Sequence, residues 1–213
     1  MVSLRQKKIM LEKITSNFQS PKDNFFGRLL LRSMNFGHRN ISKWAMSQLP
    51  KDADFKEIID IGCGGGWTLS RLLKTWNTAR VHGLDVSEAS VEKSRDYNAQ
   101  AVADGRCEVT LGNVTTMPYQ TDFFDVATAI ETAYFWNPID DGLKEVYRCL
   151  KPGGWFVIAL EAGTKGQAKF WSRHVAGMHA YDGEYLKEHL LAAGFSSVNV
   201  KTRLMYACIV ARK

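Results

Sequence analysis

A cluster of glycines directly after a short apolar segment is the feature that most restricts the fold of this chain. The segment at residues 57–61 reads Glu-Ile-Ile-Asp-Ile, and Gly62, Gly64, Gly65 and Gly66 follow it. Apolar residues then recur at helical spacing from Trp67 to Leu73. A buried strand, a tight turn and a helix form the first unit of a nucleotide-binding α/β domain. Glycine suits this turn because it lets the backbone bend sharply and lets a ligand approach closely.

Position 67 argues against a dinucleotide site. The dinucleotide fingerprint would place Gly or Ala there, so that helix and strand pack closely, but this chain has Trp67. A phosphate-binding P-loop is disfavoured because no Gly-Lys-Ser/Thr follows the glycines. The Tyr-x-x-x-Lys match from Tyr147 to Lys151 runs off a predicted helix into Pro152, which is poor context for an oxidoreductase pair.

The pattern Asp60-x-Gly62-x-Gly64-x-Gly66 resembles motif I of the class I S-adenosylmethionine (SAM) methyltransferases. The phrase Phe-Asp-Val at 124–126 and the turn Leu-Lys-Pro-Gly-Gly at 150–154 are similar to further landmarks of that family. The resemblance covers roughly residues 40 to 213. It is specific for the fold and the cofactor, and it does not specify the substrate.

The hydrophobic pattern and the resemblance together imply an α/β fold. We expect a Rossmann-like, doubly wound sheet of seven strands, mostly parallel with the last strand antiparallel, and helices on both faces. The predicted strands lie near 58–61, 79–85, 107–111, 122–130, 150–158, 196–202 and 204–211, the last two as a hairpin. The predicted helices lie near 41–49, 68–75, 87–103, 142–150 and 185–193.

A chain of 213 residues can bury one sizeable core. We expect an N-terminal helical cap on the substrate side at residues 1–50, and a SAM-binding domain at 51–213 with a pocket insertion at 161–181. The roles of the cap and the insertion are implied by the resemblance. The cap is rich in Lys and Arg, which favours an acidic partner or simply a solvated helix surface.

Asp85 ends the predicted strand 79–85, about 20 residues past the glycines, where an acid can accept both ribose hydroxyls. A helix N-cap before Ser87 is its structural alternative. The resemblance implies that Asp60 organises the turn and reaches the methionine ammonium through water. The other expected cofactor residues are Gly62, Gly64 and Gly66 by backbone access, Val86 next to Asp85 in the sequence, Asn113 and Val114 at the adenine, and Ala129 and Glu131 near the methionine part.

Methyl transfer from a sulfonium is an in-line displacement, in which the cofactor carries the reactivity and the protein aligns the reactants. A general base is needed only when the acceptor must lose a proton. The sequence therefore assigns no catalytic residue. Candidates on the acceptor side, each with an ordinary structural alternative, are His38, Tyr134, Trp171, His174, His179 and Tyr181.

The four cysteines lack CxxC spacing, which argues against a metal site and fits buried, reduced thiols in the cytoplasm. We find no apolar run long enough to span a membrane and no secretory signal. We expect a small-molecule substrate, no nucleic-acid partner, and a monomer or homodimer. The alternatives are a methyltransferase acting on RNA or protein, a SAM-binding protein without catalysis, and a nicotinamide-dependent oxidoreductase.

Overall fold

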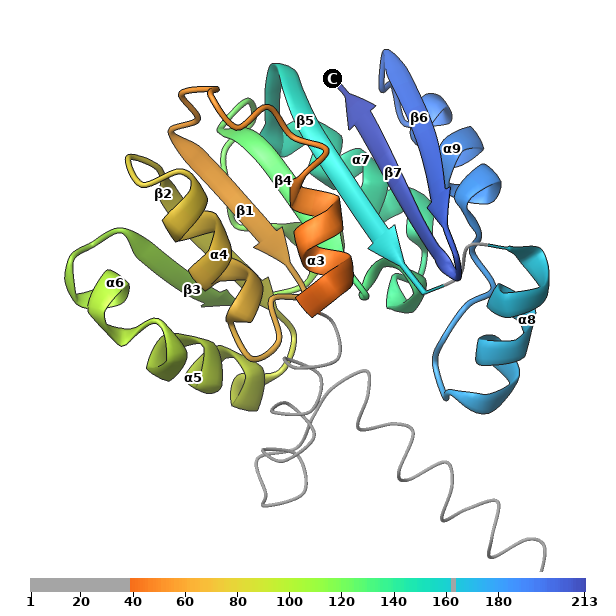
Figure 1. The fold of residues 1–213 in the computed structure, drawn as a ribbon, viewed down its shortest axis with the longest axis horizontal. Helices are drawn as coiled ribbons and strands as arrows, with labels where there is room; N and C mark the ends of the chain where they lie inside the picture. Colours follow the sequence, from red (N-terminus) through yellow and green to blue (C-terminus); the bar gives the residue numbers. More distant parts are fainter. Residues whose placement is uncertain (1–38, 162–163) are drawn as a thin grey trace, which may run out of the picture.

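The computed structural model describes residues 39–161 and 164–213, so residues 1–38 of the predicted cap at 1–50, with His38, lie outside this range (Figure 1). A seven-stranded sheet has the order β3-β2-β1-β4-β5-β7-β6. The strands are β1 (Glu57–Ile61), β2 (Arg80–Asp85), β3 (Cys107–Leu111), β4 (Phe124–Ile130), β5 (Leu150–Leu160), β6 (Ser197–Arg203) and β7 (Tyr206–Arg212).

Strands β1 to β5 pair in parallel, whereas β7 runs antiparallel between β5 and β6. The predicted Rossmann-like sheet with an antiparallel last strand is therefore confirmed. The order reverses at β1, with β2 on one side and β4 on the other. Ligands bind outside the carboxyl ends of the strands at such a point.

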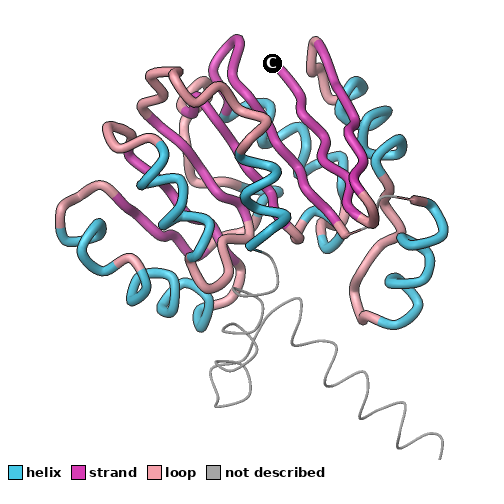
Figure 2. The backbone as a smooth tube through the Cα atoms, in the orientation of Figure 1, coloured by secondary structure: helices cyan, strands magenta, loops and turns pink. Residues whose placement is uncertain are grey.

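Helices cover both faces of the sheet (Figure 2). One face carries α3 (Arg39–Met46), α4 (Trp67–Thr75), α5 (Glu88–Tyr97) and α6 (Ala99–Ala103), and the other carries α7 (Ile139–Cys149) and α9 (Gly183–Ala192). In β5, Phe156 and Ile158 pack with the α7 and α9 side, whereas Val157 and Ala159 pack with the α3 and α4 side. This alternation follows from the two-residue repeat of a strand. Helix α8 (Lys165–His174) lies beyond the carboxyl end of β5 (Figure 1).

Helix α3 belongs to the packing of the sheet. Its side chains Ile41 and Ala45 are almost fully buried, and they join the apolar cluster that contains α4 and β5 residues. The part of the predicted cap that the structure describes therefore contributes to the core.

The single helix predicted at 87–103 is wrong, because the structure has α5 and α6 separated by Asn98. The Asn98 side chain turns inward, and its Nδ2 donates to the carbonyl oxygens of Gly66 and Ser94, both at 3.0 Å. An Asn side chain that bonds to the backbone competes with helix continuation. Asn98 thereby ties the end of α5 to the glycine turn before α4.

The amino ends of three strands are joined by one carboxylate. Asp125 Oδ2 accepts from the backbone N–H groups of Lys56 and Glu57, both at 2.8 Å. Asp125 Oδ1 accepts from Lys151 Nζ at 2.7 Å. The starts of β1, β4 and β5 are therefore held together at the edge of the sheet opposite the carboxyl ends.

All four cysteines are free and buried. None of the helices in the described ranges combines the length and the apolar composition that a membrane crossing requires.

Candidate functional site

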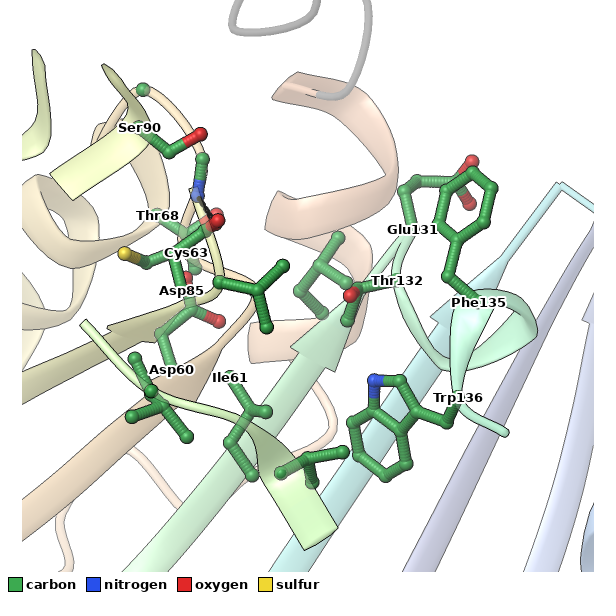
Figure 3. Close-up of a pocket in the computed structure, with 18 of the residues that line it drawn as sticks. Asp60, Ile61, Cys63, Thr68, Asp85, Ser90, Glu131, Thr132, Phe135 and Trp136 are labelled. Atoms are coloured by element: carbon green, nitrogen blue, oxygen red, sulfur yellow. Dashed lines mark hydrogen bonds between the residues drawn. The ribbon is translucent and has the colours of Figure 1, made fainter. Parts of the chain in front are cut away.

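A cavity of about 370 Å³ opens at the carboxyl ends of β1, β2 and β4 (Figure 3). Its volume lies within the range of about 300–1,000 Å³ that is usual for ligand pockets. Most of the cofactor residues predicted from the sequence line it, namely Asp60, Gly62, Gly64, Asp85, Val86, Asn113, Val114 and Glu131. Gly66 and Ala129 do not line it, and Ala129 is fully buried within β4.

The turn between β1 and α4 contains three glycines with positive φ, namely Gly62, Gly64 and Gly66. At Gly62 (φ 74°), an added Cβ would lie 2.2 Å from Thr132 Oγ1. At Gly64 (φ 52°), an added Cβ would meet no atom within 4 Å. Gly62 is therefore required by packing, whereas the open space above Gly64 is available to a ligand.

Gly66 and Trp67 explain why the third small residue of the fingerprint is absent at 67. A Cβ on Gly66 would lie 2.6 Å from Ser94 Oγ, so the close approach between α4 and α5 occurs at 66. Trp67 begins α4 and lines the cavity. The guanidinium carbons of Arg39 and Arg71 lie 5.9 and 6.0 Å from its ring. The indole therefore forms a wall of the cavity and leaves it open.

Asp85 ends β2 and is held by backbone N–H groups. Its Oδ2 accepts from Gly64 N at 2.9 Å, and its Oδ1 accepts from Ser87 N at 3.0 Å. The side chain of Ser87 is the N-cap of α5 and accepts from Ser90 N. The N-cap alternative for Asp85 is therefore wrong. Burial raises the pKa of Asp85 above its ordinary value, although these hydrogen bonds oppose the shift.

Asp60 lies below the glycine turn and is almost fully buried. Its Oδ1 accepts from Thr128 Oγ1 on β4 at 2.6 Å. Burial raises the pKa of Asp60 to about 7; the Thr128 hydrogen bond opposes the rise and the nearby Asp85 adds to it. Asp60 thus joins β1 to β4 and brings a second acid to the cavity.

The wall next to β3 is partly apolar. Val86 is 51% exposed and Val114 is buried, and both line the cavity. The exposed Asn113 caps the short helix η1 (Val114–Thr116), since its Oδ1 accepts from Thr115 N at 3.0 Å. The amide oxygen of Asn113, which was expected at the adenine, therefore already accepts a hydrogen bond within the local turn.

Glu131 directly follows β4 and lies on the other side of the cavity, away from Asp60 and Asp85 (Figure 3). It is only 6% exposed, and its φ of 57° is unusual for a residue with a side chain. The Tyr134 hydroxyl donates to its Oε2 at 3.1 Å, and the Glu161 N–H donates to its Oε1 at 2.6 Å. Burial, together with the Glu161 charge, raises the pKa of Glu131 to about 8.

The acceptor-side candidates in the described part of the chain do not line the cavity. Tyr134 is buried on η2 (Ala133–Phe135) and reaches the cavity only through Glu131. His179 N donates to the Tyr134 carbonyl at 2.8 Å, and Tyr181 OH donates to the Trp136 carbonyl at 3.3 Å. Trp171 and His174 are exposed on α8. The described part of the 161–181 insertion therefore supports the cavity wall from outside.

Several cavity residues were not among the predicted site residues. Thr132, Phe135, Trp136 and Asn137 follow Glu131 and form the wall at the end of β4. Their place just after a predicted strand was a signal for them. Ser42, Thr68 and Ser90 line the cavity from helices α3, α4 and α5, and no sequence motif marks them.

Comparison with known families agrees with this geometry. A family model described as a methyltransferase domain matches residues 59–158. The chain is 37% identical over 125 residues to 24-methylenesterol C-methyltransferase 2 of Oryza sativa subsp. japonica, a match that covers 59% of this chain and 34% of that protein. It is 28% identical over 124 residues to the uncharacterized methyltransferase YdaC of Bacillus subtilis, covering 58% of this chain and 66% of that one. The chain thus spans less than two thirds of the length of these relatives.

Solved structures share the fold. An O-methyltransferase family protein from Burkholderia thailandensis superposes with a TM-score of 0.77 at 14% identity, over 90% of this chain and 60% of that chain. Human N-acetylserotonin methyltransferase, solved with SAM bound, gives a TM-score of 0.70 at 15% identity, over 86% and 55% of the two chains.

Proposed function

The chain carries a domain of the class I SAM-dependent methyltransferase family, and on that premise we propose that the protein transfers a methyl group from SAM to a small-molecule acceptor. The observation that carries this proposal is the pairing of Asp85 with the open glycine turn at Gly64. A buried carboxylate at the end of β2 and a turn without side-chain bulk fit the ribose and the adjacent sulfur chain of such a cofactor.

The residues that line the cavity could each contact a different part of the cofactor. Asp85 would accept hydrogen bonds from the ribose, and Val86 and Val114 would flank the adenine. Gly64 would admit the chain that bears the sulfur, and Asp60 would face its ammonium. When bound, SAM supplies an electrophilic methyl group. The residues of this chain orient the reactants and exclude water, and that alignment lowers the barrier without a bond to the protein.

A small molecule is the acceptor that the cavity supports best. The wall at the end of β4 is formed by Phe135 and Trp136 with Ile130, and aromatic and apolar walls are typical of small-molecule pockets. The relatives include proteins named for methylenesterol and for squalene, which are small apolar molecules. We propose the cytoplasm as the compartment, since all four cysteines remain free thiols.

Calorimetric titration with S-adenosylhomocysteine, the product form of the cofactor, tests the proposal directly. We expect saturable binding at a single site. Titration with NADH serves as the matched control, because it carries the same adenosine on a pyrophosphate. Binding of NADH without binding of S-adenosylhomocysteine would contradict the proposal and restore the dinucleotide interpretation.

A further inference from the structure

Glu131 is a buried acid that forms no ion pair with any residue in the described part of the chain. Its carboxyl group accepts from Tyr134 OH and Glu161 N–H, and over residues 39–161 and 164–213 no Lys, Arg or His forms an ion pair with it. The carboxyl group of Glu161 lies close enough to disfavour its ionisation further. Burying an uncompensated carboxylate is costly, and such groups are normally paired.

The backbone at Glu131 is also unfavourable. A φ of 57° places a non-glycine residue in the left-handed region, which is unfavourable for a residue that carries a Cβ. The Glu131 N–H donates to the Ala159 carbonyl at 2.8 Å, and the two contacts to the side chain fix it further. A strained backbone conformation of this kind persists where several neighbouring contacts hold it in place, and such positions cluster at functional sites.

The cavity as a whole is acidic. Asp60, Asp85 and Glu131 line it, and the described lining residues include no Lys, Arg or His. Glu131 stands apart from the other two acids and lies beside Phe135, with Trp136 on the same wall (Figure 3). Aromatic faces attract cations, and they also contact apolar carbon.

From this arrangement we infer that Glu131 makes the acceptor end of the cavity selective for a protonated amine carried on an apolar or aromatic body. The inference rests on the proposed function and names its substrate class. An amine supplies the positive charge that the buried carboxylate lacks, and its carbon body packs on Phe135 and Trp136. An alcohol could donate to Glu131 but would leave the negative charge uncompensated, and a carboxylate would add to it.

The same carboxylate can take the proton that the amine must lose. An ammonium has no lone pair, so it cannot accept a methyl group until an N–H bond breaks. The proton then passes to Glu131, an O–H bond forms, and the electron pair remains on nitrogen. With its pKa at about 8, Glu131 lies close to the range in which such a transfer is efficient.

Three ligands of similar size and different charge test the inference. They are 2-phenylethylamine, 2-phenylethanol and 3-phenylpropionate, each titrated by calorimetry into the full chain saturated with S-adenosylhomocysteine at a pH of about 8.5, where Glu131 is largely ionised and the amine is largely protonated. We expect the amine to bind at least about tenfold tighter than the alcohol, and the carboxylate to bind most weakly.

Glu131→Gln keeps the shape of the side chain and removes its charge. It should weaken amine binding about tenfold or more and leave alcohol binding unchanged. Glu161→Gln is the matched control, because Glu161 is a neighbouring acid that does not line the cavity. Amine affinity in this control should stay within about threefold of the original protein.

The outcomes separate the two proposals. If the original protein does not bind S-adenosylhomocysteine, the proposed function fails and this inference fails with it. If it binds S-adenosylhomocysteine but shows no preference for the amine, only this inference is overturned. If Glu131→Gln loses S-adenosylhomocysteine binding while its melting transition is unchanged, Glu131 serves the cofactor ammonium instead, which also overturns the inference.

Discussion

The backbone N–H of Gly64 donates to Asp85 Oδ2 at 2.9 Å, and this bond links the glycine turn after β1 to the end of β2. The two sequence features that most strongly indicated a cofactor site are therefore in direct contact. The carboxylate holds the turn in place and also lines the cavity.

Removing this carboxylate should weaken cofactor binding. We expect Asp85→Ala to reduce the affinity for S-adenosylhomocysteine by about 1.5–3 kcal/mol, the range for hydrogen bonds to a charged group. Calorimetry measures the change, and a melting curve shows whether the variant is folded. Asp96→Asn, an exposed acid on α5, should bind normally. Unchanged affinity in a folded Asp85→Ala would contradict the ribose assignment.

Two alanine substitutions in the glycine turn should have different effects, one mainly on stability and the other mainly on cofactor binding. Gly62→Ala adds a clash with Thr132 to the strain of a positive φ, so we expect a loss of about 2–5 kcal/mol in the free energy of unfolding. Gly64→Ala introduces the strain of a positive φ but no clash, so it should lower the free energy of unfolding by only about 1–2 kcal/mol. Because its methyl group enters the cavity, it should instead impair binding. Denaturant unfolding and calorimetry distinguish the two, and equal losses of stability would refute the distinction.

The raised pKa of Glu131 predicts a pH-dependent contribution to stability. Its folded pKa of about 8 exceeds the ordinary value of 4.5, so the folded state holds the proton more tightly and stability falls as pH rises between these values. The difference in the free energy of unfolding between Glu131→Gln and the original protein should shift in favour of the variant by on the order of 1 kcal/mol per pH unit across this interval. Above the interval, the difference should reach a plateau. Unfolding in urea at a series of pH values measures the difference, and a flat difference would argue against the raised pKa.

Asn98 should matter for stability because its side chain is buried between α5 and α6. Asn98→Ala leaves the carbonyl groups of Gly66 and Ser94 without this buried donor, which should cost about 1–3 kcal/mol. Gln100→Ala, an exposed neighbour on α6, should change the free energy of unfolding by less than about 0.5 kcal/mol. Similar losses in the two variants would mean that the bonds to Gly66 and Ser94 contribute little.

The sheet and the cofactor side of the cavity could be predicted because their signals are local. A strand followed by glycines and an acid about 20 residues later describe adjacent parallel strands, and such strands deliver their ends to one place. Asp60, Gly62, Gly64 and Asp85 meet at the cavity for this reason. β1 pairs in parallel with both β2 and β4, so the reversal in strand order lies at the strand that precedes the glycine turn.

The remaining residues depend on tertiary contacts that no local pattern records. Asn98 interrupts a helix because of a bond to Gly66, which is distant in sequence. Ser42 and Ser90 face the cavity only because α3 and α5 pack in particular orientations. Glu131 was assigned to the methionine part from its position after β4, whereas its burial and its separation from Asp60 became visible only in three dimensions (Figure 3).

Asp125, at the start of β4, bonds to the start of β1 and to Lys151 at the start of β5, and these bonds have a consequence for engineering. Strand alignment is secured at the edge of the sheet opposite the cavity. Side chains in the loop after β4 can therefore be varied without breaking these bonds. A library aimed at new acceptors should randomise the segment that begins at Phe135, and it should keep constant both Asp125 and Thr132, which packs against Gly62.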